Sequence, residues 1–314
     1  MRRGLIAQAA LVAALALVLG WLWQNAAHNL ETRKIASGFA FLWREAGFEI
    51  GETGGLAYSA ADSYLRALAI GLANTFRVAA IGIVFATVLG ALLGLARLAP
   101  NWLLAKLAAA YVEFVRNVPL VVQLFFWYAL ISENLPGPRE ALQPLPGVYL
   151  SNRGIFFPLP GSAPQLAGFN FTGGASLSPE FAALLAGLIT YTAAFIAEIV
   201  RAGILSVRRG QLDAARSLGM TRRQALRHVV LPQALRAIVP PMTSQYLNLV
   251  KNSSLAVAIG YPDLVSIANT TINQTGQAIE GIAIIMAVYL TVSLAISAFM
   301  NWYNRRVALK GLRA

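Results

Sequence analysis

The chain has 314 residues, of which 57% are hydrophobic and 12% are charged, and its net charge at pH 7 is +12. This balance, with a mean hydropathy of +0.61, excludes an ordinary water-soluble domain and is typical of a protein that crosses a membrane several times. Cysteine is absent and His28 and His228 lie far apart in the sequence, so we expect no disulfide, metal site or catalytic residue. The sequence also has no P-loop motif with which to bind ATP.

An apolar run at about 5–23 follows two arginines and predicts a first transmembrane helix. A secretory signal peptide begins in the same way. Its cleavage site would need small residues where Trp21 and Trp23 stand, so we interpret the run as a retained helix. The rest of an N-terminal part at 1–66 is more polar and predicts a periplasmic segment, with a short interfacial helix near 39–48.

Five further apolar runs fall within residues 67–303, which we expect to form the membrane core. They lie at 67–96, 107–131, 181–205, 237–259 and 281–303. Pro119 predicts a kink in the second of these runs, and the proline pair at 240–241 would open the fourth. The chain around 261–277 predicts a re-entrant piece, and a basic tail follows at 304–314. We therefore expect an all-α integral membrane protein with about six transmembrane helices.

Charge assigns the loops to two sides of the membrane. The N-terminus, the loops 97–106 and 201–236 and the tail together hold sixteen Lys and Arg residues, whereas the opposite loops hold six. The positive-inside rule therefore predicts an inner-membrane, multi-pass protein with both termini in the cytoplasm. On the periplasmic side, the loop 133–180 contains eight prolines and seven glycines. We expect this loop to be irregular but ordered, because its four phenylalanines make it too apolar for a free linker.

A polar, arginine-rich segment at 208–232 stands between two of the apolar runs and predicts a hairpin of two short helices. Gly219 would end the first helix, because glycine readily adopts the positive φ found there. Thr221 and Gln224 have the spacing of a capping box for the second helix, and Pro232 would end it. A DNA-binding helix-turn-helix and an ordinary surface loop are the alternatives. The flanking membrane spans argue against nucleic acid as a partner.

The spacing of Asp213-Ala214-Ala215, Gly219 and Pro232 resembles the EAA loop of ABC importer permeases. In that family the loop is the cytoplasmic coupling helix that docks onto an ATPase subunit. The usual Glu of the motif is Asp213 here, which we expect to keep its charge at a helix N-terminus with a shorter reach. The resemblance implies contacts to the ATPase through Gly210, Gln211, Asp213, Ala214, Ala215, Gly219 and Pro232.

A wider resemblance covers about 71–302 and is to the polar-amino-acid branch of these permeases. It rests on VEFVRNVPLVVQ at 112–123, EIVR at 198–201, VRRGQ at 207–211, LPQAL at 231–235 and LVKNSSL at 249–255. The N-terminal span and the proline-rich loop look like those of general L-amino-acid permease subunits. The resemblance implies a type I ABC importer permease fold, with this chain forming half of the path for an amino acid.

The same resemblance implies several partners. They are a dimer of ATP-binding subunits, a periplasmic amino-acid-binding protein and a second permease chain, which would be a related chain rather than an identical copy. ATP and Mg would be used by the ATPase, so this chain would bind no cofactor and would not be an enzyme. An ion-coupled secondary amino-acid transporter or a channel, working without an ATPase, is the alternative function.

An amino acid inside the membrane needs polar partners for its carboxylate and its ammonium, because unpaired charge is costly there. The candidates for this path are Gln123, Thr192, Glu198, Lys251, Asn252 and Ser253. Lys251 and its two polar neighbours would serve the carboxylate. Glu198, Thr192 or Gln123 would serve the ammonium. Two structural roles stay open as alternatives: Glu198 would pair with Arg201 at i,i+3, and Lys251 would satisfy backbone carbonyls.

Overall fold

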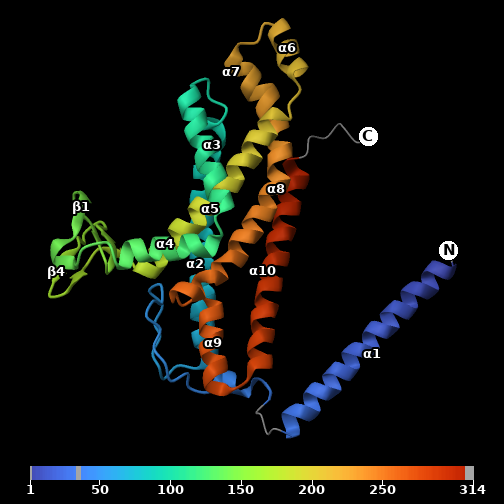
Figure 1. The fold of residues 1–314 in the computed structure, drawn as a ribbon, viewed down its shortest axis with the longest axis vertical. Coiled ribbons are helices and arrows are strands. Elements are labelled where there is room, and N and C mark those ends of the chain that lie inside the picture. The colour runs from blue at the N-terminus through green and yellow to red at the C-terminus, as the bar shows by residue number, and fades with distance from the viewer. Residues whose placement is uncertain (1, 33–36, 308–314) are drawn as a thin grey trace.

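The computed structural model describes residues 2–32 and 37–307, and most of its long helices stand together as a bundle (Figure 1). The helices of the bundle are α2 (Tyr64–Ala96), α3 (Trp102–Asn117), α4 (Leu120–Ser132), α5 (Pro179–Leu205), α8 (Leu231–Asn252), α9 (Leu264–Thr275) and α10 (Ala278–Val307). The helix expected near 39–48 is a single 3₁₀ turn, η1 (Phe39–Trp43). Its Phe41 is buried against the start of α2 and against α9.

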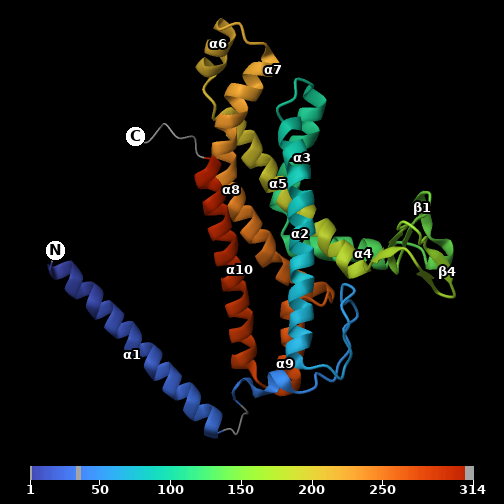
Figure 2. The same cartoon turned by 180° about the vertical axis from the view of Figure 1, so that it is seen from behind.

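The N-terminal helix α1 (Arg2–Thr32) stands away from the bundle (Figures 1 and 2). It is longer than the expected 5–23, because no glycine or proline follows Trp23 to stop it. Its apolar part, Ile6–Asn29, has 24 residues and is not buried by the rest of the chain. At about 1.5 Å per residue, this length is enough to cross a hydrocarbon core of about 30 Å.

Helix α2 packs along α5, and small residues on α2 set the distance between the two helices. Ala86, Gly90 and Gly94 recur every four residues and are all buried. A Cβ atom at Gly90 would lie 2.6 Å from the Cβ of Ile196, and one at Gly94 would lie 2.8 Å from the carbonyl oxygen of Ala197. The missing side chains therefore let the two backbones approach closely, as small residues do in many membrane-helix pairs.

Helices α3 and α4 meet at 105°, so the run expected at 107–131 is broken rather than merely kinked. A residue before proline disfavours the helical backbone, and Val118 before Pro119 is extended, with φ −94° and ψ 127°. The amide of Gln123 bridges the break, because its Nε2 donates to the carbonyl oxygens of Val115 and Val118 at 2.9 and 3.0 Å. Helix α4 then runs across the bundle toward a small sheet (Figure 1).

The loop 133–180 is not irregular, because it folds into short antiparallel strands. Four of them form a sheet in the order β1-β2-β3-β6, and β4 pairs with β5. The strands are β1 (Leu142–Leu145), β2 (Val148–Ser151), β3 (Gly154–Phe157), β4 (Gln165–Ala167), β5 (Asn170–Thr172) and β6 (Ala175–Leu177). The ring of Phe171 joins the two sheets, with its centroid 4.6 Å from that of Tyr149 and 4.9 Å from that of Phe156. The protein is therefore mostly helical rather than all-α.

Helix α8 begins at Leu231 rather than at 237, so Pro240 and Pro241 lie inside the helix instead of opening it. A 3₁₀ segment, η4 (Ser253–Ile259), extends it. Among the described residues, four helices are long and apolar enough to cross a membrane. Two bent pairs, α3 with α4 and the α8 region with α9, raise the number to six. The expected six spans agree with this upper number.

Helix α9 occupies the stretch in which a re-entrant piece was expected. Asp263 caps its start by accepting a hydrogen bond from the backbone N–H of Ser266 at 2.9 Å, and Gly276 ends it with φ +72°. The hydroxyl of Tyr64 on α2 donates to the side-chain oxygen of Gln274 at 2.8 Å. This contact and a shared apolar core hold α9 against the first turns of α2.

Candidate coupling hairpin and substrate path

A helical hairpin stands at one end of the molecule, beyond the ends of α5 and α8 (Figures 1 and 2). Its two short helices are α6 (Arg209–Ser217) and α7 (Arg222–Ala225). Gly219 lies between them with φ +76°, and its N–H donates to the carbonyl oxygen of Arg216 at 2.9 Å. The N–H of Met220 donates to Ala215 at 3.1 Å, which completes a Schellman helix end. The predicted turn at Gly219 is confirmed.

The predicted capping box of the second helix is confirmed as well. The N–H of Gln224 donates to the hydroxyl of Thr221 at 3.3 Å, and the side-chain oxygen of Gln224 accepts from the N–H of Thr221 at 2.9 Å. Ala215 and Ala225 are 3% and 0% exposed, respectively, where the two arms of the hairpin meet. A larger side chain at either position would separate the arms.

Pro232 does not end the second arm, contrary to expectation. After α7 the chain makes a π-helical turn, η3 (Leu226–Val230), and continues into α8 without a break. In this wider turn the N–H of Leu231 donates to the carbonyl oxygen of Leu226, five residues back. A π-turn changes the hydrogen-bond register, so the helix accommodates a proline that has no N–H to donate. One arm of the hairpin is therefore continuous with α8.

The outer face of α6 is open to a partner. Gly210, Gln211, Asp213 and Ala214 are all exposed. Asp213 lies in the middle of α6 rather than at its N-terminus, so the expected stabilisation by the helix dipole does not apply. Its carboxylate is 3.8 Å from Arg216, and both side chains are more than half exposed, so this ion pair contributes little stability.

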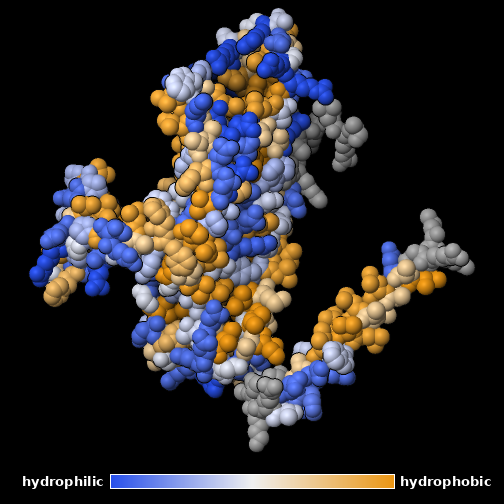
Figure 3. Space-filling view, viewed as in Figure 1, coloured by the Kyte–Doolittle hydropathy of each residue, from blue (hydrophilic) through white to orange (hydrophobic). Residues whose placement is uncertain are grey.

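Leu218 is a candidate that the sequence analysis missed. Its side chain is 79% exposed at the tip of the hairpin, although hydrophilic side chains cover much of that end of the molecule (Figure 3). It directly precedes Gly219, whose positive φ turns the chain and leaves Leu218 pointing outward. A large apolar side chain at the tip of a polar hairpin is well placed to be buried by a partner.

Near the same end of the bundle, Glu198 on α5 forms ion pairs with two arginines. Its Oε1 accepts from Nη2 of Arg201 at 2.5 Å, and its Oε2 pairs with Nη1 of Arg97. Arg97 is the C-cap residue of α2, so the carboxylate connects the C-terminal end of α2 to α5. The pairing with Arg201 is one of the two roles left open for Glu198, and the contact to Arg97 is new.

The remaining path candidates have different surroundings. Thr192 is buried on α5, and Gln123 uses its amide to bridge the α3–α4 break. Ser253 is fully buried, and its hydroxyl donates to the carbonyl oxygen of Val250 at 2.8 Å. Lys251 is exposed, and Asn252 beside it is half-buried.

Glu198 and Lys251 are not brought together. Helix α5 ends at the hairpin, whereas α8 begins there and runs in the opposite direction. Glu198 pairs with Arg97 at the end of α2, whereas Leu249, two residues before Lys251, packs at Gly82 in the middle of α2. At about 1.5 Å per residue, the two charges are roughly 20 Å apart along the bundle. A single ligand therefore cannot bridge these two charges.

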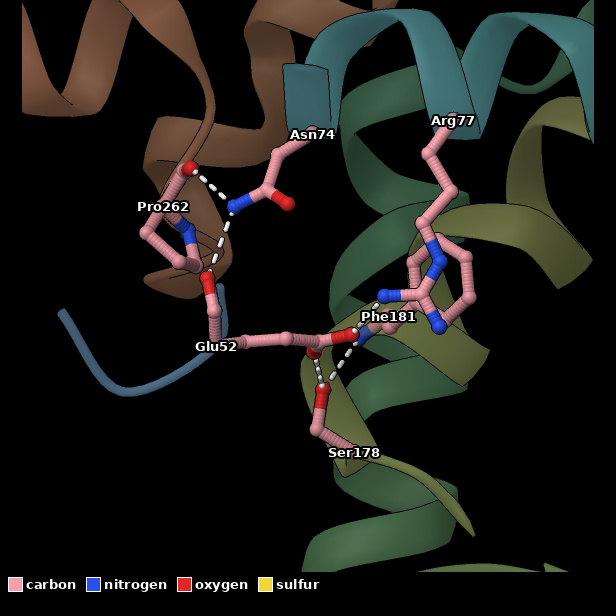
Figure 4. A network of polar contacts seen from close by, with 6 residues as sticks. All are labelled: Glu52, Asn74, Arg77, Ser178, Phe181 and Pro262. Atoms are coloured by element: carbon pink, nitrogen blue, oxygen red, sulfur yellow. Dashed lines mark hydrogen bonds and ion pairs between the residues drawn. The ribbon is translucent and has the colours of Figure 1, made fainter. Parts of the chain in front are cut away.

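Toward the opposite end from the hairpin lies a polar network that the sequence analysis did not assign (Figure 4). The carboxylate of Glu52 accepts from Nη1 of Arg77 at 2.7 Å and from the hydroxyl of Ser178 at 2.5 Å. Ser178 also caps α5, because its hydroxyl accepts from the N–H of Phe181 at 3.1 Å. The guanidinium of Arg77 lies 4.4 Å from the centroid of the Phe181 ring.

Asn74 extends this network to a fourth segment. Its Nδ2 donates to the backbone carbonyls of Glu52 at 2.8 Å and of Pro262 at 2.9 Å (Figure 4). The network therefore connects the segment before α2, α2 itself, the start of α5 and the connection from η4 to α9. The available sequence signal was that Asn74 and Arg77 interrupt an apolar run.

These features identify the class of protein. Several membrane-crossing helices carry a soluble hairpin that is held by two of them and exposes an apolar tip, as expected of the membrane subunit of a transport complex. A family profile described as "Binding-protein-dependent transport system inner membrane component" matches residues 82–309, and the chain belongs to this family. It is a multi-pass permease subunit of the inner membrane.

Individual relatives match over almost the whole chain. YhdX of Escherichia coli (strain K12), which carries the provisional name of an amino-acid ABC transporter permease protein, is 47% identical over 357 residues, covering 93% of this chain and 91% of YhdX. The "General L-amino acid transport system permease protein AapQ" of Rhizobium johnstonii is 42% identical over 353 residues, covering 92% of this chain and 88% of AapQ.

Solved structures agree with the fold. A chain described as "Crystal structure of an amino acid ABC transporter with histidines" has a TM-score of 0.58 and 27% identity, covering 77% of this chain and 95% of that chain. A chain of the MetNI methionine ABC transporter, at 19% identity and a TM-score of 0.56, covers 78% of this chain and 98% of its own length. The second likeness concerns the fold alone.

Membership of this family shows what each subunit of the complex does. The chain is a permease, and ATP is hydrolysed by a separate subunit. ATPase subunits and a binding protein are its partners, and permeases of this family use no cofactor. Within the described residues there is no group of three or more His, Asp or Glu that could hold a metal ion.

Proposed function

We propose that this chain is a permease subunit of an ATP-driven amino-acid uptake system. The observation that carries this proposal is the hairpin: α6 exposes its small-residue face and Leu218, and its second arm is continuous with the membrane helix α8. The names of YhdX and AapQ support an amino acid as the substrate. Closure of the ATPase subunits around the hairpins would move α8 and so switch the path between inward-facing and outward-facing states.

The orientation follows from charge. In the sequence, the hairpin, the loop 97–106 and the two terminal segments hold most of the lysines and arginines, whereas the sheet and the segment before α2 hold few. We assign the hairpin and both termini to the cytoplasm and the sheet to the periplasm. This orientation brings the hairpin to the side where ATP is available.

The second permease chain is proposed to be a related but different polypeptide. General amino-acid permeases of the kind that this chain resembles are expected to pair with a second, homologous permease subunit. The small-residue face of α6 would then dock on one ATPase subunit, and the corresponding hairpin of the partner would dock on the other. The residues proposed for direct contact are Gly210, Gln211, Asp213 and Ala214, together with Leu218, whereas Ala215, Gly219 and Pro232 would hold the hairpin in the shape that docks.

For the membrane path, Lys251 is the candidate for the substrate carboxylate, with Asn252 and Ser253 beside it. Lys251 is exposed at the end of α8. An unpaired charge inside a membrane is costly, so a substrate carboxylate would be a favourable partner for its ammonium group. Gln123 and Thr192 remain candidates for the ammonium of the substrate. Glu198 is better suited to holding α2 and α5 together, because two arginines already occupy its carboxylate.

Reconstitution tests the function directly. The complex with its ATPase, second permease chain and binding protein, in proteoliposomes, should accumulate radiolabelled L-amino acids only when ATP is present on the hairpin side. Lys251→Met should depress the uptake of all substrates in parallel, because the carboxylate is common to every amino acid. Uptake that needs an ion gradient and proceeds without the ATPase would favour an ion-coupled secondary transporter and overturn the proposal.

A further inference from the structure

A cleft of about 340 Å³ opens beside the Glu52 network, between the segment 51–55, Arg77 on α2 and the sheet. It is the size of a site for a small molecule. The side chains that matter for its chemistry are Arg77, Arg153, Glu52 and Asn170. The segment before α2 and the sheet, which line this cleft, belong to the side that we assign to the periplasm.

The charges in this cleft do not balance. Arg77 and Arg153 supply two positive charges, and Glu52 supplies one negative charge. Glu52 is paired with Arg77 at 2.7 Å. In the described part of the chain, the guanidinium of Arg153 has no carboxylate within 4.0 Å, and its side chain is exposed to solvent. The cleft therefore offers an uncompensated positive charge to an anionic group.

Arg77 is held in position to bind such a group. Its Nη1 donates to Glu52, and its guanidinium lies over the ring of Phe181 at 4.4 Å. This arrangement fixes the plane of the guanidinium group and leaves its other N–H groups to bind a ligand. A Cβ atom at Gly54 would lie 3.5 Å from Nη1 of Arg77, and the φ of +66° at Gly54 suits glycine, so the turn leaves room beside the guanidinium.

Asn170 adds a neutral donor from the sheet. Its side-chain oxygen accepts from the N–H of Phe171 at 2.9 Å, which directs the oxygen to the backbone and leaves the NH₂ group to donate. Two guanidinium groups and one amide donor therefore face a space with a single carboxylate. Charge-assisted bonds from arginine to a carboxylate are strong and directional, so this donor set matches a ligand carboxylate.

We propose that this cleft receives the carboxylate of an amino acid on the periplasmic side, before the amino acid enters the path between the helices. The carboxylate is bound by Arg153 and Arg77, with Asn170 as a further donor, and Glu52 holds Arg77 in position. This inference rests on the proposed uptake of amino acids. The site is built from the segment before α2, α2 and the sheet, and it is separate from Lys251 at the end of α8.

Equilibrium dialysis of the purified complex without its binding protein tests the site, with radiolabelled L-glutamine as the probe. The wild-type complex should bind it saturably, and 4-aminobutanamide, which is glutamine without its carboxylate, should not compete. Arg153→Met should weaken binding about ten- to a hundredfold. Arg153→Lys, which keeps the charge but cannot donate two parallel hydrogen bonds to a carboxylate, should weaken binding less.

Arg139→Met is the matched control, because Arg139 also belongs to the loop 133–180 but lies over the ring of Phe169, outside the cleft. It should bind L-glutamine like the wild type. The inference is overturned if wild-type binding is absent, if 4-aminobutanamide competes equally well, or if Arg153→Met and Arg139→Met behave alike. ATP-driven uptake by the wild-type complex separates the two claims: uptake without binding in the cleft rejects only this inference, whereas absence of uptake rejects the proposed function.

Discussion

Gly219 decides the geometry of the hairpin through its backbone alone. Nothing lies within 4 Å of a Cβ atom placed there, but its φ of +76° disfavours any residue with a side chain. The cost of that conformation is about 1–2 kcal/mol for most residues, and Asn tolerates it better than others do. A substitution at Gly219 therefore tests conformation without steric conflict.

Gly219→Val should reduce ATP-driven uptake at least several-fold while the protein still inserts into the membrane. We expect ATP hydrolysis to continue without stimulation by the loaded binding protein, because the reshaped turn no longer seats the hairpin. Uptake, ATPase activity and the amount of complex in the membrane are measured together. Gly219→Asn is the control and should retain most uptake. Wild-type transport by Gly219→Val would show that the turn is not part of the transmission.

Glu198 allows a test of stability at the residue scale. Glu198→Gln removes the charge that holds Arg97 and Arg201 together. We expect the free energy of unfolding to fall by about 1–3 kcal/mol, because the Glu198 carboxylate is only partly exposed. Thermal unfolding of the solubilised complex measures it. Asp213→Asn breaks an exposed pair of the same i,i+3 kind and should change stability by less than about 0.5 kcal/mol. Equal effects of the two substitutions would contradict the bracing role of Glu198.

At this scale the sequence predicts local features well. The capping box of Thr221 and Gln224 and the turn at Gly219 depend on neighbours within a few residues, and both are present. Glu52 could not be assigned in the same way, because its partner Ser178 is 126 residues away. Leu218 was not predicted either, because the exposure of its side chain depends on how α6 and α7 pack in the folded hairpin.

Among the elements, the pair of α2 and α5 depends most clearly on small residues. Gly90→Leu would insert a side chain where the Cβ alone is 2.6 Å from Ile196, so α2 and α5 would have to move apart. We expect a cost of about 1–3 kcal/mol or more and a lower yield of folded complex.

The yield of monodisperse complex and its unfolding temperature measure this effect. Gly20→Leu is the matched control, because Gly20 lies on α1 with nothing within 4 Å of its Cβ position. That variant should behave like the wild type. If both leucine variants were equally stable, close packing at Gly90 would not hold α2 against α5.

The long helices were predictable because length and apolar composition identify a membrane span without tertiary information. The break at Pro119 was visible as a proline, but its angle was not. The direction that α4 takes after the break depends on a distant contact, because Leu124 packs against Gly187 on α5, where a Cβ atom would lie 2.5 Å from the leucine. The strands are three or four residues long, too short for a clear alternation of apolar and polar residues.

At the scale of the whole molecule, two sets of polar contacts hold helices together, one near each end of the bundle. Near the hairpin, Glu198 holds the C-terminal ends of α2 and α5 together, and the π-turn makes the hairpin continuous with α8. Toward the opposite end, the network around Glu52 connects α2, the start of α5 and the connection from η4 to α9 (Figure 4). We therefore expect a displacement of the hairpin to be transmitted along α5 and α8 to the segments around the Glu52 network.

The central claim is that the hairpin receives the force of the ATPase, and site-specific cross-linking tests it most directly. The chain contains no cysteine, so Leu218→Cys introduces a single thiol at the tip of α6. With a cysteine-reactive photo-cross-linker on that thiol, the assembled complex should give a covalent product with the ATPase subunit, and ATP should change its yield. Ser162→Cys, in the loop between β3 and β4, should give no ATPase product. A cross-link to the ATPase from position 162, or none from position 218, would contradict the account.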